Sequence, residues 1–203
     1  MQRKKAILIV SGILLVAIVA LLIVLTADQP GSGNLLGYTG PSVSGEGSLA
    51  YMRIEGLKQG VVDGGVTDAG REATHAIYSI EHLIEVPIDQ NTGMPTGMRR
   101  HRPFVVTTQI SSGTPLLNQM CTTGEQAKVT IEYWHINAQG QEEKYYEAIL
   151  DSALVMKISQ YKPMVFIPEN ESYGDMVEIS FSYKKITWRH LASGIETYDD
   201  WRY

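Results

Sequence analysis

The chain has 203 residues, a hydrophobic fraction of 44% and a formal net charge of −5. That hydrophobic content is sufficient for a packed core and excludes wholesale disorder. Three of the 17 basic residues (Arg3, Lys4 and Lys5) precede the first acidic residue, so the rest of the chain sets 14 basic residues against 22 acidic ones. This balance argues against a nucleic-acid-binding protein, which needs a basic face to meet phosphates.

Residues 6–25 form an uncharged run dominated by isoleucine, leucine and valine. As a helix, a run of this length would reach about 30 Å, the hydrocarbon thickness of a bilayer. The apolar region of a cleavable signal peptide is usually about 7–15 residues long, and Leu25 stands where a small residue would favour cleavage. We therefore predict a transmembrane signal anchor within residues 1–27, with a cleaved signal peptide as the alternative. The basic residues before the run predict a cytoplasmic N-terminus and an extracytoplasmic domain.

Residues 28–48 are rich in glycine, serine and proline. Such a segment buries too little apolar surface to offset the ordering of its backbone, so we predict a flexible linker. A single folded domain is then expected over residues 49–203.

Most of this domain alternates apolar and polar residues with period two, the pattern of half-buried strands. The alternating apolar positions are Met52 and Ile54; Ile80, His82 and Ile84; Phe104, Val106 and Ile110; Val129, Ile131 and Tyr133; and Ala148, Leu150, Leu154, Met156 and Ile158. The last set predicts a longer strand with some apolar residues on both faces. Residues 137–140 predict a hairpin turn in which Gly140 takes the left-handed conformation.

The final long strand carries a change of parity. Its apolar residues are Val177, Ile179, Phe181 and Tyr183, followed by Ile186 and Trp188. The switch across Lys184 and Lys185 predicts a β-bulge or a change of face.

One short helix interrupts the strands. Thr114 is a suitable N-cap, Pro115 suits the first helical position, Leu117 and Met120 have helical spacing, and Gly124 ends the run. Many strands and one short helix predict a mainly β fold, a small barrel or a sandwich with the helix covering one opening.

Residues 87–102 form a long polar loop without a periodicity of its own. Such loops are uncommon in compact domains unless they bind something. Arg99, Arg100 and Arg102 cluster at its end in an otherwise acidic protein, so charge pairing between subunits is one interpretation. A solvated loop with scattered cations is the alternative.

Several motifs occur in a specific order over residues 49–203. They are Tyr51-Met-Arg-Ile-Glu-Gly56, the loop 91–97, His101-Arg-Pro-Phe104, Ser112-Gly-Thr-Pro-Leu-Leu117 and Lys185-Ile-Thr-Trp188. Together they resemble Hcp, the haemolysin-coregulated protein family whose members form the inner tube of type VI secretion systems. Each motif is modestly specific, and their common order and spacing make the resemblance strong.

The resemblance implies a small Hcp-like β-barrel with one short α-helix that assembles into hexameric rings, which stack into a tube. It implies contacts with the spike protein and the contractile sheath, and effector cargo in the lumen. It also implies that the long loop reaches the adjoining ring. The candidate ring-stacking residues are Asn91, Thr92, Gly93, Thr96, Gly97, Arg99, Arg100 and Arg102.

The apolar segment 6–25 departs from the family pattern, because family members assemble their tube in the cytoplasm. An inserted segment would anchor the domain in the inner membrane, facing away from the cytoplasm. A segment that does not insert would leave cytoplasmic assembly or secretion open. Two hypotheses follow: a structural ring or tube protein, and a membrane-tethered extracytoplasmic barrel that binds a partner without building a tube.

Sequence signals for chemistry are absent. The five histidines do not occur at metal-ligand spacing, and neither a nucleophile elbow nor a phosphate-binding loop is present. Cys121 is the only cysteine and has no basic neighbour in the sequence, so a buried structural role is expected. We expect no enzymatic activity, no cofactor and no catalytic or metal-binding residues.

Overall fold

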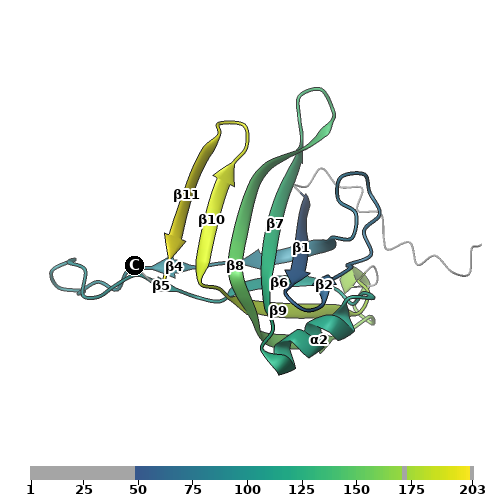
Figure 1. Cartoon of the computed structure of the whole chain (residues 1–203), viewed down its shortest axis with the longest axis horizontal. Coiled ribbons are helices and arrows are strands. Elements are labelled where there is room, and N and C mark those ends of the chain that lie inside the picture. The colour runs from purple at the N-terminus through teal and green to yellow at the C-terminus, as the bar shows by residue number, and fades with distance from the viewer. Residues whose placement is uncertain (1–48, 171–172, 202–203) are drawn as a thin grey trace, which may run out of the picture. The chain divides into compact units, whose positions relative to one another are not determined.

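The computed structural model describes residues 49–170 and 173–201, within one compact unit that spans Val43–Tyr203 (Figure 1). The elements, in chain order, are β1 (Leu49–Gly56), β2 (Gly60–Val61), β3 (His75–Glu81), β4 (Ile84–Glu85), β5 (Arg100–His101), β6 (Phe104–Gln109), α2 (Thr114–Thr123), β7 (Gln126–Ile136), β8 (Glu142–Tyr161), a 3-10 turn (Pro168–Asn170), β9 (Met176–Ser182), β10 (Lys185–His190) and β11 (Ile195–Asp200). In these described ranges no helix has the length and apolarity needed to cross a membrane. The predicted signal anchor and linker lie outside the described residues.

Six antiparallel strands close into a barrel, in the order β8, β7, β1, β3, β6, β9 and back to β8. This confirms the mainly β barrel with one short helix. β10 and β11 continue the sheet from the first half of β8 and form a two-stranded flange beyond the barrel (Figure 1).

The long strand β8 closes the barrel by changing partners along its length. Its first half pairs with β7 and with β10, where Leu150 lies opposite Ile186. Its second half pairs with β9, from Leu154 opposite Ser182 onward. Between these halves Ser152 has a φ of 50°, a left-handed conformation that is uncommon for a residue with a side chain.

This kink explains why β8 carries apolar residues on both faces, as its sequence predicted. Ala148 and Leu150 point into the core before the kink, and Ala153 and Val155 point into it afterwards. Met156 is consequently exposed, although a strict alternation from Leu150 would have buried it.

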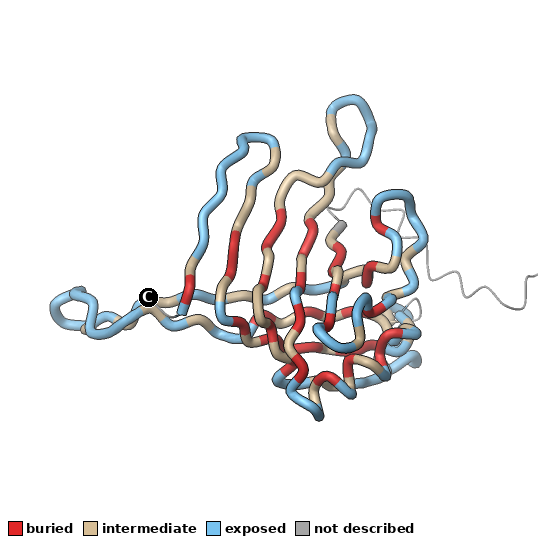
Figure 2. The backbone as a smooth tube through the Cα atoms, in the orientation of Figure 1, coloured by how far each residue is buried: buried red, intermediate tan, exposed pale blue. Residues whose placement is uncertain are grey.

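The core fills the barrel and extends under α2, and Figure 2 shows buried residues concentrated there rather than on the flange. Leu117 and Met120 on α2 are fully buried and belong to the same cluster as Met52, Ile54 and Val129 on the strands. The helical spacing of these residues therefore gave the correct buried face.

The helix begins one residue earlier than predicted. Gly113 is the N-cap and Thr114 is the first helical residue. A Cβ at Gly113 would lie 2.6 Å from the carbonyl oxygen of Asp63, so the close approach of two backbones selects glycine there. Thr114 uses its hydroxyl to accept a hydrogen bond from the Ser111 amide at 2.9 Å. Gly124 ends the helix, as predicted, and takes the left-handed conformation.

Two predicted strands are interrupted. The alternation over residues 80–85 is split between β3 and β4, because the chain leaves the barrel after Glu81. The parity change at Lys184 and Lys185 marks the end of β9 and the start of β10, where the chain moves from the barrel to the flange.

His75 is buried at the start of β3. Its Nε2 lies 3.2 Å from the carbonyl oxygen of Val62, which fits donation to that oxygen, and none of the described residues offers a partner to its buried Nδ1. Burial lowers the pKa of His75 to about 4 from its ordinary value of 6.5. The folded protein therefore keeps His75 neutral at pH values where the unfolded chain would bind a proton.

Replacing His75 by glutamine should reduce the acid sensitivity of the fold. The unfolded chain binds more protons than the folded one between pH 6.5 and about 4, so this histidine lowers the free energy of unfolding as pH falls through that window. The loss reaches about 3 kcal/mol at the acid end. Urea titrations of wild type and His75→Gln at pH 7 and pH 4 measure the difference, with exposed His190→Gln as the control. Equal pH dependence in wild type and His75→Gln would contradict the assignment.

Candidate functional site: an extended arm and its root

Residues 83–102 form an arm that leaves the barrel as a long hairpin (Figure 1). At its base β4 pairs with β5, with Ile84 opposite His101. Further out, the Thr96 amide donates to the carbonyl oxygen of Pro87 and the Asp89 amide to that of Met94, each at 2.9 Å. The loop predicted without periodicity is thus a hydrogen-bonded hairpin.

The tip of the arm is organised around Asp89. Its carboxylate accepts hydrogen bonds from the amides of Asn91 and Thr92 at 2.9 Å, and from the Thr92 hydroxyl at 3.1 Å. These bonds, led by that from the Thr92 amide, lower the pKa of Asp89. Gly93 follows with a φ of 67°, which completes the turn.

Asp89 was absent from the predicted site residues, although an aspartate two to four positions before Asn91, Thr92 and Gly93 is a typical turn signal. Thr96 contributes its backbone to the hairpin, whereas Gly97 has room for a side chain, since an added Cβ would approach only Pro87, at 3.9 Å. The tip is therefore a preformed turn.

The arm also presents apolar side chains that are not among the predicted site residues. Val86, Ile88, Met94 and Met98 are all exposed, Met94 by 65% and Met98 by 74%. Apolar groups gathered on one projecting element mark an interaction surface. The alternation of Ile84, Val86 and Ile88 in the sequence was the available signal for them.

The three arginines of the predicted cluster have different environments. Arg99 turns back to β11, where its guanidinium makes a two-pronged contact with the Asp199 carboxylate and donates to the carbonyl oxygen of Asp200 at 3.0 Å. Arg102 pairs with Glu85 across the base of the arm at 2.9 Å. Arg100 is exposed, and none of the described side chains forms an ion pair with it. Two of the three cations are thus engaged within the subunit.

A partly buried polar cluster fixes the root of the arm. Its members, called the root cluster below, are His82, His101, Tyr183 and Asp199. The Tyr183 hydroxyl lies 2.7 Å from His82 Nε2 and 2.8 Å from His101 Nδ1, and His101 Nε2 lies 2.8 Å from an Asp199 oxygen. The His101 side chain is only 2% exposed.

Aromatic rings and charge enclose the root cluster. Phe104 stacks on His82 with ring centroids 4.7 Å apart, and Trp201 lies 5.1 Å from His101. The hydrogen bonds from Arg99 hold the pKa of Asp199 below its ordinary range, so this carboxylate stays ionised. Burial raises the pKa of Tyr183, which therefore keeps its proton.

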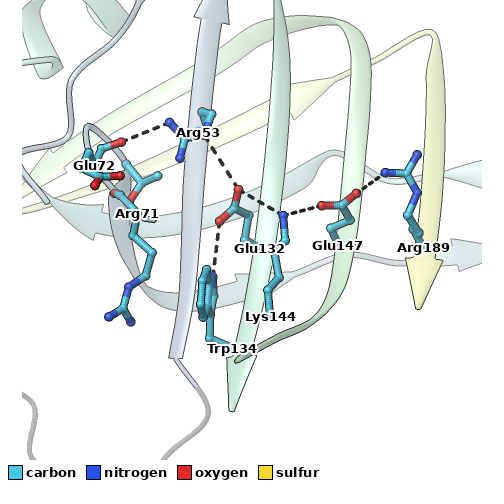
Figure 3. Close-up of polar contacts among 9 residues, drawn as sticks. Arg53, Arg71, Glu72, Glu132, Trp134, Lys144, Glu147 and Arg189 are labelled. Carbon is cyan, nitrogen blue, oxygen red and sulfur yellow. Dashed lines mark hydrogen bonds and ion pairs between the residues drawn. The ribbon is translucent and has the colours of Figure 1, made fainter. Parts of the chain in front are cut away.

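A second polar feature, the charge row, crosses the outer face of the sheet from β1 to β10 (Figure 3). Glu132 and Glu147 lie directly opposite each other on β7 and β8, an arrangement that repels when unpaired. Lys144 lies between them, 3.7 Å from Glu132 and 2.9 Å from Glu147, while Arg53 reaches Glu132 and Arg189 hydrogen-bonds Glu147. Both carboxylates have cationic partners, which suits a structural row rather than proton transfer.

The described part of the chain contains no group of three or more histidine, cysteine, aspartate or glutamate residues able to hold a metal ion. Cys121 is partly buried and packs against the core. The arm, with its exposed apolar side chains and its hydrogen-bonded root, is the candidate contact surface of the described domain.

Removing Arg99 should uncouple the arm from β11, whereas removing Arg100 should not. Urea unfolding of Arg99→Ala, Asp199→Asn and the double variant should give effects that do not add, because the two side chains are in direct contact. The same cycle with Arg100→Ala is the matched control and should be additive. Additive effects for Arg99 and Asp199 would show that their contact does not stabilise the root.

Comparison with known proteins places this geometry in a family. Residues 51–190 match the family described as "Type VI secretion system effector, Hcp". The "Major exported protein" of Pseudomonas aeruginosa strain PAO1 is 34% identical over 163 residues, which cover 75% of this chain and 95% of that protein. A crystal structure of an Hcp protein has a TM-score of 0.72 at 29% identity and covers 77% of this chain and 99% of its own. The secreted protein Hcp3 from Pseudomonas aeruginosa has a TM-score of 0.61 at 30% identity, covering 77% of this chain and all of its own. The chain belongs to the Hcp family of type VI secretion proteins.

Proposed function

We propose that this chain forms hexameric rings that stack into a type VI secretion tube, and that the arm makes the contact between stacked rings. Family membership supports the ring and tube role, and the 34% identity to an exported protein supports secretion. The spike protein, the contractile sheath and effectors in the lumen are the partners that this role implies. The structural role requires no catalysis.

One observation carries the role of the arm. Exposed methionine, isoleucine and valine side chains project on a hairpin whose tip and root are both held by hydrogen bonds. A preorganised apolar element loses little conformational freedom on binding, so it suits repeated contacts between identical rings. The eight residues predicted for ring stacking remain part of this proposal, with Arg100 as the cation that is free to pair with a neighbouring ring.

The flange supports subunit association in a different way. β11 pairs only with β10 among the described strands, so no described strand lies along its second edge. Ile195 and Tyr198 on this strand are exposed. Association of copies would cover such an edge, which is consistent with a ring.

Charge placed on the arm should stop stacking without stopping ring formation. Met94→Asp combined with Met98→Asp puts two carboxylates into the proposed contact, where desolvation opposes association. Light scattering and electron microscopy of the full chain in mild detergent, and of a fragment starting at Val43, should show stacked rings for wild type and single rings for the variant.

Leu57→Asp is the matched control, since Leu57 is equally exposed but lies on the turn after β1. Unchanged stacking in the arm variant would remove the arm from the ring contact. A wild-type protein that stays monomeric at high concentration would remove the ring proposal altogether.

A further inference from the structure

The root cluster joins segments that are far apart in the sequence. His82 follows β3, His101 lies on β5, Tyr183 follows β9 and Asp199 lies on β11. The Tyr183 hydroxyl bridges the two imidazoles, and Asp199 holds the outer nitrogen of His101. Four hydrogen-bonded side chains therefore connect the base of the arm to the end of β9 and to the flange.

The ionised Asp199 fixes the direction of every hydrogen bond within the root cluster. A carboxylate only accepts, so His101 Nε2 carries a proton and donates it to Asp199. His101 Nδ1 is then bare in the neutral ring and accepts from the Tyr183 hydroxyl. The Tyr183 oxygen is left to accept from the Nε2–H of His82. With both histidines neutral, every one of these bonds is satisfied.

The cluster accommodates one additional proton but not two. If His101 is protonated on both nitrogens, it donates to Tyr183, and the hydroxyl can turn to donate to a bare Nε2 of His82. If His82 is protonated as well, both rings donate into the same oxygen and the Tyr183 proton has no acceptor in the chain. The two cationic rings would also face each other with centroids 6.3 Å apart.

The surroundings of His82 oppose its charged form. Burial is the main cause that lowers the pKa of His82, and the charge of His101 lowers it further. Phe104 from β6 covers one face of its ring. Beside the cluster, Arg99 on the arm contacts Asp199 and Asp200 on β11, and the exposed Lys184 and the partly buried Lys185 follow Tyr183 in the sequence. Both acidic groups act on Arg99, whereas the charge that acts on His82 is that of His101.

We propose that the root cluster is a proton-sensitive latch that holds the arm in place while no more than one of its two histidines is charged, and loosens it when His82 is charged together with His101. In this doubly charged state both rings donate into the Tyr183 oxygen, His82 loses its place beside Tyr183 and Phe104, and the segment between β3 and β4 is released. The latch itself rests on the geometry of the root, and only its consequence for ring stacking rests on the proposed function.

The direction of the effect follows from linkage. A histidine whose folded pKa lies below its ordinary value of 6.5 stabilises the native arrangement above that pH, and this stabilisation is lost as pH falls. Protection of the arm should therefore be full near pH 7.5 and should decrease as the pH falls below about 6.5.

Hydrogen–deuterium exchange of the full chain tests the latch. Mass spectrometry of peptides from residues 83–98, corrected for intrinsic exchange, should show at least about tenfold weaker protection at pH 5 than at pH 7.5 in wild type. His82→Gln retains a donor but cannot titrate, so its arm protection should change less than about twofold between these pH values. Exposed His135→Gln, whose ring contacts Glu143 on the distant β7–β8 hairpin, is the control and should behave like wild type.

Tyr183→Phe supplies an independent variant. It removes the bridging hydroxyl, so the arm should be weakly protected at both pH values, while peptides of β1 and β7 report an intact barrel. A wild-type arm whose protection does not change with pH would overturn the proposal, as would a pH response that persists in His82→Gln.

The exchange experiment is separable from the test of ring stacking. Sedimentation at pH 7.5 measures whether rings stack, and exchange of the unstacked protein measures the latch. A chain that never stacks but shows the His82-dependent change would retain the latch and remove the proposed function.

Discussion

The closure of the barrel depends on one strand. β8 pairs with β10 up to Asp151 and with β9 from Leu154 onward, on either side of Ser152, while its pairing with β7 runs on to Leu154. Without that left-handed residue the alternation from Leu150 would continue, and Leu154 and Met156 would take the core positions that Ala153 and Val155 occupy. The kink therefore does two things together: it closes the core and it directs the flange away from the barrel.

The flange in turn supplies the carboxylate that holds the base of the arm. Asp199 on β11 holds both Arg99 and His101, and its low pKa keeps it ionised under ordinary conditions. An arm of exposed apolar residues would gain little from a stable tip if its root could swing freely. A partly buried, hydrogen-bonded cluster at the root gives the arm a defined direction, and a defined direction lowers the entropic cost of a contact.

Local sequence predicted the barrel walls but not the root of the arm. Met52 with Ile54 and Val129 with Ile131 alternate because one strand face is buried, and this pattern lies within a short window. The split after β3 has no such signal, since the alternation continues through it. What fixes the chain there is a hydrogen bond between His82 and Tyr183, 101 positions apart, and a contact between Arg99 and Asp199, 100 positions apart.

The three arginines form one cluster in the sequence but not in the structure. Arg99 pairs with Asp199 and Arg102 with Glu85, whereas none of the described side chains forms an ion pair with Arg100. The predicted division into anchor, linker and domain stays a prediction.

The continuity of β8 also has a mechanical consequence. A strand of 20 residues would span roughly 66 Å if it were straight, so one covalent segment runs from the distal hairpin, past the flange, into the barrel wall. A pull along that segment would load its ladders with β7 and β9 in shear, where many hydrogen bonds resist at the same time. A pull across the flange would instead open the β10–β11 pair one bond after another. The fold is therefore stiff along one axis and yielding along another, and the direction of an applied load decides which part deforms first.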